Sequence, residues 1–438
     1  MNDHKVKLTN RGYTINKKMF FDKIEQFRKE LTVQPELNNT QTRYGNWDGD
    51  GNQFMVYKEN DSKMYLPRFY GLTKIGYPDI IELDEGKVYP EIKFLGQLRD
   101  YQKIIVKNAN EQLDKTGGCV IVMPCGLGKT SVALFLAAHR KLKTYVIVHK
   151  ESLLKQWKER IEYFLPGIQV GTIRGSIIDN NKPIVICMLQ SISKKSYDPT
   201  IFKDVGMVIV DECHHISAEI FSRALPKLAS RYMIGLSATP FRKDGLTKVF
   251  VWYLGEIIRL PNEILEQIEI KGVIVKRIIF ESKHLQEVHD KTGNISVPLS
   301  INKIIKCEIR NALLLSELVK LINQGRHILF LSERIKHLRI IRSMIDEMAI
   351  PGCITCFYIG KGGKNGMTDE DYEKAEYASL ILGTMQMAQE GLDLPHLNTL
   401  VLATPKSDIE QAVGRILRRE SNLCPFVIDI VDNYSLFV

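Results

Sequence analysis

The fold is most constrained by a rhythm of short apolar runs, each long enough for one β-strand, that alternate with segments of helical pattern. The rhythm occurs twice. Its first series of runs is Val120–Met123, Thr144–Val148, Pro183–Met188, Val208–Val210 and Met233–Leu236. Its second series is His327–Leu331, Cys353–Tyr358, Leu380–Gly383, Thr399–Ala403 and Pro425–Ile428. Because such alternation builds crossover units, the sequence predicts an α/β protein with two buried parallel sheets in tandem.

The first 95 residues follow a different pattern. A helical stretch is expected over Lys18–Leu31, and a hairpin of Gln53–Lys58 with Lys63–Leu66 in a region rich in aromatic side chains. This region predicts a small α+β accessory domain. A chain of 438 residues is too long for one core. We therefore expect an accessory domain at 1–95, sheet domains at 96–261 and 306–438, and a connecting segment at 262–305.

Composition narrows the class of partner only slightly. The formal net charge of +9 favours a polyanionic partner, although many basic enzymes bind none. The first ten residues lack the apolar core of a signal peptide, and the apolar runs are too short to span a membrane. Cysteines inside strand-like runs suit a reducing, intracellular compartment. Cys353 and Cys356 form one CxxC without a second pair, so we expect two thiols and no structural zinc.

A glycine-rich segment follows the strand Val120–Met123 and leads into a helical pattern. Its residues are Pro124, Cys125, Gly126, Leu127, Gly128, Lys129, Thr130 and Ser131. Strand, loop and helix in this order predict a phosphate-binding loop for ATP, in which Lys129 pairs with the β- and γ-phosphates and the Thr130 hydroxyl ligates Mg²⁺. The usual pattern has glycine where Met123 stands, and a glycine turn before a helix is the simpler alternative.

Two carboxylates, Asp211 and Glu212, follow the run Val208–Val210. In parallel sheets ligand sites lie at the carboxyl ends of strands. We expect Asp211 to hold Mg²⁺ and Glu212 to orient and deprotonate the attacking water. An acidic pair alone is more often a helix cap, but a pair that follows a phosphate loop favours catalysis. His214 is a candidate for coupling hydrolysis to the next motif, and His215 for a bystander.

These motifs resemble those of superfamily 2 helicases. Asp211–His214 resembles the DExH box, Gly235–Pro240 motif III, Arg99–Gln102 the glutamine motif, Gln389–Asp393 motif V, and Gln411–Arg418 motif VI. With Phe241–Gly245, the set is most similar to the XPB/UvsW-like branch, whose domains are RecA-like lobes. The segment Met64–Gly71 resembles the N-terminal region of poxvirus-type transcript-release helicases.

The resemblance implies roles for further residues. Gln102 would read the adenine, and Asp393 would bridge the nucleotide and the nucleic acid. Gln411 would complete the ATP site with Arg415 and Arg418, whose spacing puts both arginines on one helix face. The implied nucleic-acid contacts are Lys150, Gln190, Arg334, Gly360 and Thr384. Trp157 would line the same track, although a helical tryptophan is more often core.

The sequence thus predicts an ATP- and Mg²⁺-dependent helicase or translocase. The branch implies DNA as the substrate and 3′-to-5′ movement, with RNA as the other candidate. The alternatives are a duplex translocase or annealing motor that does not unwind, and a nucleic-acid clamp that is switched by ATP. Residues 1–95 would grip duplex, dock a protein partner or pack on the first lobe. A viral-type transcription or repair complex, in the nucleus, cytoplasm, virion or viral factory, is the expected setting.

Overall fold

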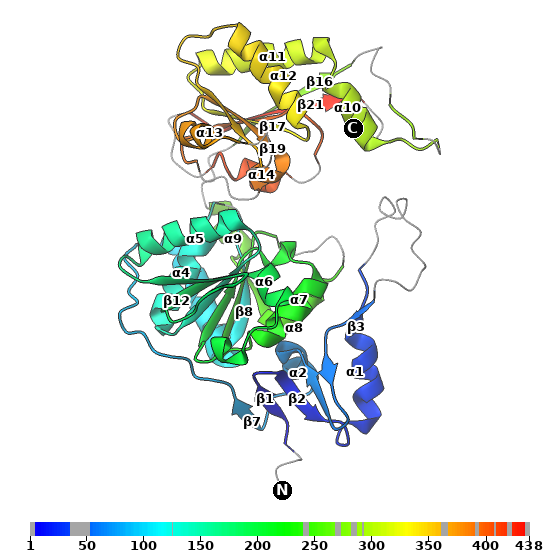
Figure 1. Ribbon diagram of the computed structural model, residues 1–438, viewed down its shortest axis with the longest axis vertical. Coiled ribbons are helices and arrows are strands. Elements are labelled where there is room, and N and C mark those ends of the chain that lie inside the picture. Colours follow the sequence, from blue (N-terminus) through cyan, green and yellow to red (C-terminus); the bar gives the residue numbers. More distant parts are fainter. Residues whose placement is uncertain are drawn as a thin grey trace. The chain divides into compact units, whose positions relative to one another are not determined.

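The computed structural model describes residues 5–35, 53–124, 126–239, 245–267, 273–281, 287–290, 293–360, 367–389, 394–406, 409–417 and 423–433. The chain divides into two compact units, residues 1–267 and 268–438, which are described separately below. Each unit contains a parallel sheet, and the first unit also contains the N-terminal α+β region (Figure 1). None of the described helices is long and apolar enough to cross a membrane.

The N-terminal region forms a five-stranded sheet of order β5-β6-β2-β1-β7. Its strands are β1 (Lys7–Thr9), β2 (Gly12–Asn16), β5 (Lys58–Glu59), β6 (Lys63–Leu66) and β7 (Ile80–Glu82). A separate pair joins β3 (Thr32–Val33) to β4 (Phe54–Met55), and the helices are α1 (Ile24–Glu30) and α2 (Arg68–Lys74). The small α+β region predicted from the sequence is therefore present.

Two predicted elements differ in detail. The helix expected over Lys18–Leu31 begins as a 3-10 turn at Phe21 and becomes α-helical only at Ile24. The strand expected over Gln53–Lys58 is split, because β4 pairs with β3 while β5 pairs with β6. The hairpin turn is tighter than predicted, since the Asn60 side chain accepts hydrogen bonds from the backbone of Ser62 and Lys63.

The N-terminal region shares one hydrophobic core with the parallel sheet of its unit. Buried side chains such as Tyr13, Phe27 and Tyr70 belong to the same cluster as Val120 and Phe250. The Tyr70 ring lies edge-on to Trp252, 5.3 Å between centroids. This is the packing role that the sequence left as one of three alternatives.

Arg68 adds a polar tie to this core. Its guanidinium donates to the backbone carbonyls of Thr116, Ser230 and Arg231, at 2.6 to 3.1 Å. The N-terminal region is therefore fixed against the amino-terminal end of β14 by both apolar and polar contacts.

The first parallel sheet has the order β11-β10-β12-β9-β13-β14-β8-β15, and its edge strand β11 pairs antiparallel with β10. Its strands are β8 (Gly118–Val122), β9 (Thr144–Val148), β10 (Val170–Arg174), β11 (Ile177–Asp179), β12 (Ile184–Met188), β13 (Met207–Val210), β14 (Tyr232–Ser237) and β15 (Glu256–Arg259). All five predicted strands are present within two residues, and all pairings among them are parallel. The strands β10, β11 and β15 were not predicted.

Helices cover both faces of this sheet (Figure 1). They are α3 (Asp100–Thr116), α4 (Lys129–Arg140), α5 (Glu151–Phe164), α6 (Leu189–Lys194), α7 (Ala218–Ala224), α8 (Thr247–Leu254) and α9 (Asn262–Gln267). The short 3-10 turns are Pro199–Phe202, Cys213–His215 and Leu225–Lys227. The helices α3, α4 and α5 pack on one another, as do α6, α7 and α8. The central strands are buried along their whole length, as parallel strands between two helical layers must be.

The second unit has a six-stranded parallel sheet of order β16-β21-β20-β17-β19-β18. Its strands are β16 (Ile274–Phe280), β17 (Ile328–Ser332), β18 (Thr355–Tyr358), β19 (Leu380–Thr384), β20 (Thr399–Leu402) and β21 (Phe426–Asp432). Its helices are α10 (Val297–Ile304), α11 (Glu308–Asn323), α12 (Ile335–Glu347), α13 (Asp369–Lys374), α14 (Met385–Gln389) and α15 (Glu410–Val413). Neighbouring strand residues alternate between two core clusters, one on each face.

The edge strand β16 lies within the segment that the sequence predicted to be a connection. It pairs in parallel with β21 from Ile274 to Phe280. Ile274, Val275 and Ile279 remain exposed, so β16 lacks the buried alternation that identified the other strands. The three boundaries between the four segments given above stay predictions.

A buried polar network crosses the second unit. Arg310 forms a two-point ion pair with Asp432, at 2.6 and 2.8 Å. Nearby, the His337 ring lies 3.0 Å from both Ser332 Oγ and Asn311 Oδ1. Burial, with the Arg310 charge as a second cause, lowers the pKa of His337 to about 3. His337 is therefore neutral, and it holds the end of β17 in place.

This network predicts a dependence of stability on pH. The unfolded chain protonates His337 near its ordinary pKa of 6.5, whereas the folded chain does so only near 3. Its contribution to stability is therefore complete above pH 6.5 and is lost as the pH falls toward 3, by at most about 1.4 kcal/mol per pH unit. In thermal unfolding, His337→Gln should reduce this acid sensitivity. The exposed His139→Gln should leave it unchanged, and an equal slope for wild type and His337→Gln would contradict the account.

Candidate functional site

Three of the predicted motifs converge at the carboxyl ends of three neighbouring strands of the first unit, β13, β14 and β8. The phosphate loop follows β8, the acidic pair follows β13, and Ser237 ends β14. Val122 is opposite Ser237, and Val210 is opposite Gly235, so these ends are level. The sheet therefore brings together three motifs that lie far apart in the chain.

The phosphate loop depends on two glycines with left-handed backbone. Gly126 has a φ of 84° and Gly128 one of 82°. A Cβ on Gly128 would lie 2.4 Å from Gln102 Nε2 and 2.8 Å from Ser131 Oγ. Gly128 caps the twelve-residue helix α4, whose first residues are Lys129 and Thr130. The open helix end, with small residues before it, fits a bound phosphate chain. Pro124 and Leu127 belong to this loop, and Cys125 lies outside the described residues.

Gln102 is buried against the phosphate loop. Its Nε2 donates to the Leu127 carbonyl oxygen at 2.9 Å, and its Oε1 accepts from the Arg99 backbone N–H at 3.0 Å. In this structure both ends of the amide are used within the protein. Gln102 thus braces the loop, and the adenine contact implied by the resemblance stays a prediction.

Lys129 and Glu212 face each other across the site. Lys129 Nζ lies 3.8 Å from Glu212 Oε1 and donates to the Met123 carbonyl oxygen at 3.3 Å. Glu212 has left-handed backbone, with φ of 45°, where non-glycine residues are uncommon. This conformation turns the chain sharply after β13 and presents the Glu212 carboxylate to the loop.

Asp211 is almost fully buried and is held by Trp157. The indole Nε1 donates to Asp211 Oδ2 at 2.8 Å, from helix α5. Burial, together with the charge of Glu212, raises the pKa of Asp211 to about 6, while the Trp157 hydrogen bond acts in the opposite direction. Trp157 is itself only 1% exposed, so it is a core residue and not a stacking platform. The sequence missed this contact, because only the strand order places α5 beside the end of β13.

His214 links the acidic pair to β14. Its Nδ1 lies 2.8 Å from Ser237 Oγ and 3.5 Å from Glu212 Oε2. The Ser237 hydroxyl also donates to the Thr239 carbonyl oxygen. A chain of contacts therefore runs from the acidic pair to the segment after β14. The side chain of His215 and the residues Pro240 to Asp244 lie outside the described residues.

Two of the predicted nucleic-acid residues lie at this same edge of the first unit. Lys150 follows β9 and caps helix α5. Gln190, on α6 after β12, is exposed and donates to the His149 carbonyl oxygen at 2.6 Å. Since β9 and β12 are neighbours, the two residues belong to one continuous edge.

In the second unit, the sheet brings together Arg334, Thr384 and Gly360. Arg334 and Gly360 follow β17 and β18, and Thr384 is the last residue of β19, which lies between these two strands. Ser332 Oγ accepts from the Arg334 backbone N–H at 3.2 Å, and the Arg334 side chain donates to Asn302 at 2.8 Å. Thr384 Oγ1 accepts from the Met387 backbone N–H at 3.4 Å. Gly360 is exposed, with open space around it.

Of the predicted arginine pair, the structure describes only Arg415. The helix α15 ends at Val413 and residues 414–417 form a turn, so Arg415 does not lie on that helix, and the helix face that it would share with Arg418 stays a prediction. Glycine at position 414 disfavours continuation of the helix. Gln411 is half-buried on α15, and Arg415 is 9% exposed. Arg418 and Asp393 lie outside the described residues.

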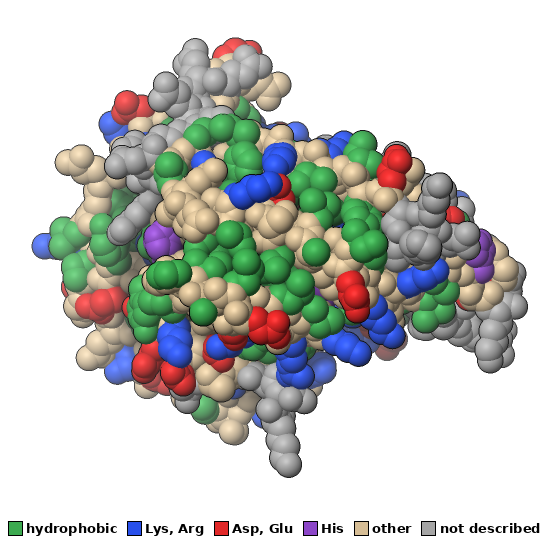
Figure 2. Space-filling view, turned by 90° about the horizontal axis from the view of Figure 1, so that it is seen from above, with side chains coloured by type: hydrophobic (Ala, Val, Ile, Leu, Met, Phe, Trp, Pro, Cys, Tyr) green, Lys and Arg blue, Asp and Glu red, His purple; other side chains and the backbone are tan. Residues whose placement is uncertain are grey.

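Among the described residues, no group of three or more histidine, cysteine, aspartate and glutamate side chains forms a metal cluster. Cys353 is partly exposed and Cys356 is buried, and both are free thiols. Figure 2 shows Lys and Arg side chains scattered among apolar and acidic ones on the face in view. Charge alone therefore does not identify a nucleic-acid track on that face.

The phosphate-loop nucleoside triphosphatases are defined by a strand, a glycine loop and a helix that begins with Lys-Thr. Here an Asp-Glu pair follows a second strand of the same sheet, one strand removed from the first. Residues 95–242 match the family described as type III restriction enzyme, res subunit. A protein of Acanthamoeba polyphaga mimivirus, provisionally named ATP-dependent RNA helicase L396, is 36% identical over 98% of this chain and 82% of its own length.

Two further matches are a curated protein and a solved structure. The DNA 3'-5' translocase XPB2 of Sulfurisphaera tokodaii is 32% identical over 48% of each chain. The crystal structure of T4 UvsW aligns with 96% of this chain and 88% of that one, at 18% identity and a TM-score of 0.39. The chain belongs to the superfamily 2 helicases, in the group found in large DNA viruses, and is an ATP-hydrolysing enzyme with two RecA-like sheets.

The contact between Trp157 and Asp211 predicts a role for the indole in turnover. Trp157→Phe keeps the aromatic packing but removes the hydrogen bond to a buried carboxylate, a contact worth about 1.5–3 kcal/mol. Steady-state ATP hydrolysis should therefore slow by about tenfold or more. Trp252→Phe, which changes a half-buried tryptophan in the core shared with α2, is the matched control and should hydrolyse ATP normally. Equal rates for the two variants would show that Trp157 only fills space.

Proposed function

We propose that the protein is a DNA-directed motor that uses Mg²⁺ and ATP to move along a strand in the 3′-to-5′ direction. The observation that carries the proposal is one shared edge in the first unit. The ATP-site residues Lys129, Asp211 and Glu212 follow β8 and β13, and Lys150 and Gln190 follow the next strands along, β9 and β12. A conformational change at the ATP site can therefore reach nucleic acid bound at Lys150 and Gln190 through neighbouring strands of one sheet.

The residues present fit a magnesium nucleotide. Thr130 and Asp211 would hold Mg²⁺. Thr130 lies in the first turn of α4, and Asp211 is a buried carboxylate that follows β13 at the same edge of the sheet. When bound, the ion would supply charge neutralisation for the phosphate oxygens. Lys129 neutralises the phosphates from the side of α4. Glu212 accepts the proton of the attacking water, and His214 holds Glu212 toward Ser237.

The second unit would complete the reaction with Gln411, Arg415 and Arg418. Arg415 is nearly buried in the described turn, which suits a guanidinium that is held in one orientation. An arginine that stabilises the transferred phosphate adds about 10³–10⁵ in rate in related chemistry. Asp393 would connect this site to the strand bound at Thr384.

The second unit would grip the nucleic-acid backbone through Arg334, Gly360 and Thr384. All three lie at or just after the ends of adjacent strands, and Gly360 has no side chain to obstruct a phosphate. Grip on phosphates and sugars explains binding without sequence preference. The names of the relatives point to both substrates, since one is named for RNA and another for DNA. We favour DNA, because the motif set is most similar to the XPB-like branch.

A second candidate is a duplex translocase that moves without separating strands. The name of the relative XPB2, a DNA 3'-5' translocase, favours it. Separation of a tailed duplex, measured beside triplex displacement on an untailed duplex, distinguishes the two. A motor that unwinds separates the first substrate, and a pure translocase acts only on the second.

The proposed function predicts that ATP turnover depends on nucleic acid. Basal hydrolysis should be low and should rise at least about tenfold with saturating DNA, a coupling of roughly 1.4 kcal/mol. Titrations of the ATPase with single-stranded DNA, duplex DNA and RNA compare the three substrates. The DNA concentration that gives half-maximal stimulation should increase with salt concentration. Lys150→Ala should raise the half-saturating DNA concentration, whereas the exposed Lys107→Ala on α3 should not. Equal rates with DNA, with RNA and without nucleic acid would exclude the motor.

A further inference from the structure

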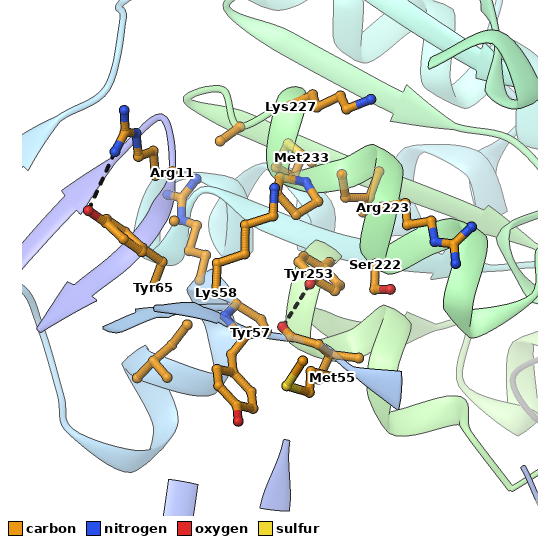
Figure 3. A pocket seen from close by; sticks show the side chains of 18 of the residues that line it. Arg11, Met55, Tyr57, Lys58, Tyr65, Ser222, Arg223, Lys227, Met233 and Tyr253 are labelled. Carbon is orange, nitrogen blue, oxygen red and sulfur yellow. Dashed lines mark hydrogen bonds between the residues drawn. The ribbon is translucent and has the colours of Figure 1, made fainter. Parts of the chain in front are cut away.

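A cavity of about 590 Å³ lies between the N-terminal region and the first parallel sheet, within one compact unit (Figure 3). Its walls come from the turn between β1 and β2, from residues 53–58, from β6, from α7 and from the segment between α7 and β14. It is remote from the ATP site along the sheet, because it reaches Met233 near the start of β14, whereas Ser237 of the ATP site ends that strand. Its volume lies within the range of about 300–1,000 Å³ that is usual for small-molecule sites.

Four cationic side chains line this cavity without a carboxylate partner. They are Arg11, Lys58, Arg68 and Lys227, and none of the four takes part in an ion pair within the part of the chain that the structure describes. Glu219 also lines the cavity, but it is paired with Arg223 four residues away. The cavity therefore carries an excess of positive charge that the protein itself does not neutralise.

For two of these cations, burial makes the charged form energetically unfavourable. Arg68 has a buried Nε with no hydrogen-bond partner, and burial lowers the pKa of its guanidinium to about 10. Lys227 Nζ donates to the carbonyl oxygens of Ile192 and Lys195, at 2.7 and 3.1 Å, but these neutral partners leave its charge unpaired. Burial lowers the pKa of Lys227, and the nearby charge of Lys58 acts in the same direction. Like charges that converge in a partly desolvated space are unfavourable unless an anion binds between them.

Aromatic and sulfur-containing side chains form the rest of the wall. Tyr65 lies beneath the Arg11 guanidinium, 5.7 Å from the ring centroid, and its hydroxyl accepts from Arg11 at 3.5 Å. Tyr253 is anchored by its hydroxyl to the Val56 carbonyl oxygen at 2.9 Å, and Met55 and Met233 lie close by (Figure 3). Aromatic faces beside cations suit a ligand that combines a flat ring with a negative charge.

We propose that this cavity binds a nucleotide, with its phosphate among Arg11, Lys58 and Lys227 and its base against the aromatic wall. The nucleotide is either a free monophosphate or one unit of a single strand, and the chemistry of recognition is the same for both. An acidic peptide would satisfy the cations but would make little use of the tyrosine faces. The site is separate from the phosphate loop and does not depend on ATP hydrolysis.

The test measures binding to the full-length protein without ATP, by calorimetry, for four probes. These are thymidine 5′-monophosphate, the tetranucleotide (dT)₄, inorganic phosphate and a decamer of glutamate. Thymidine monophosphate is chosen because it lacks the β- and γ-phosphates that Lys129 is placed to hold. Arg11→Gln with Lys58→Gln removes two exposed cations of the cavity, and Lys29→Gln with Lys107→Gln removes two exposed lysines outside it.

We expect the monophosphate or (dT)₄ to bind saturably to the wild type, and at least about tenfold more weakly to the cavity variant. The control variant should bind as the wild type does, and basal ATP hydrolysis should be normal in both. Binding of the monophosphate would identify a free ligand, and binding of (dT)₄ alone a strand. The proposal is overturned by equal nucleotide binding to the wild type and the cavity variant, by phosphate binding as tightly as the nucleotide, or by binding of the glutamate decamer alone.

Discussion

The arrangement of the first unit depends on one buried carboxylate. Asp211 ends a fully buried strand, where an ionised group is unfavourable unless it is hydrogen-bonded or neutralised. Trp157 supplies the hydrogen bond from α5, and the charge of Lys129, at the start of α4, acts against the rise in the pKa of Asp211. The order of the strands is thus tied to the chemistry, because another order would leave Asp211 buried without these contacts.

The N-terminal region alters this common architecture. Its core is continuous with that of the parallel sheet, and Arg68 joins it to carbonyl groups before β14. The junction is closed on its apolar side by Tyr70 and Trp252 and left open as a cavity on its basic side. The region therefore has a structural role toward the first sheet, and it creates a surface that the sheet alone would not have.

The sequence identified the strands that are buried on both faces, because a strand covered on both faces is a continuous apolar run that stands out from its surroundings. It missed β16, whose Ile274, Val275 and Ile279 are exposed at a sheet edge. It placed the phosphate loop and the acidic pair together correctly, since both follow strands. It could not show that Gln102 braces the loop or that Trp157 holds Asp211, because those contacts join elements by strand order and not by spacing. It expected a helix to carry Arg415, but Gly414 lies in the turn after α15.

We propose that Glu212, which lies between Lys129 and His214, is the general base that deprotonates the attacking water in ATP hydrolysis. The most direct measurement is a single-turnover assay of Glu212→Gln with saturating DNA, beside a measurement of ATP binding by the same protein. The account predicts that the variant binds ATP as the wild type does while hydrolysis falls by at least about a hundredfold, because an amide cannot accept the proton of the attacking water. Hydrolysis at close to the wild-type rate, with ATP bound, would contradict it.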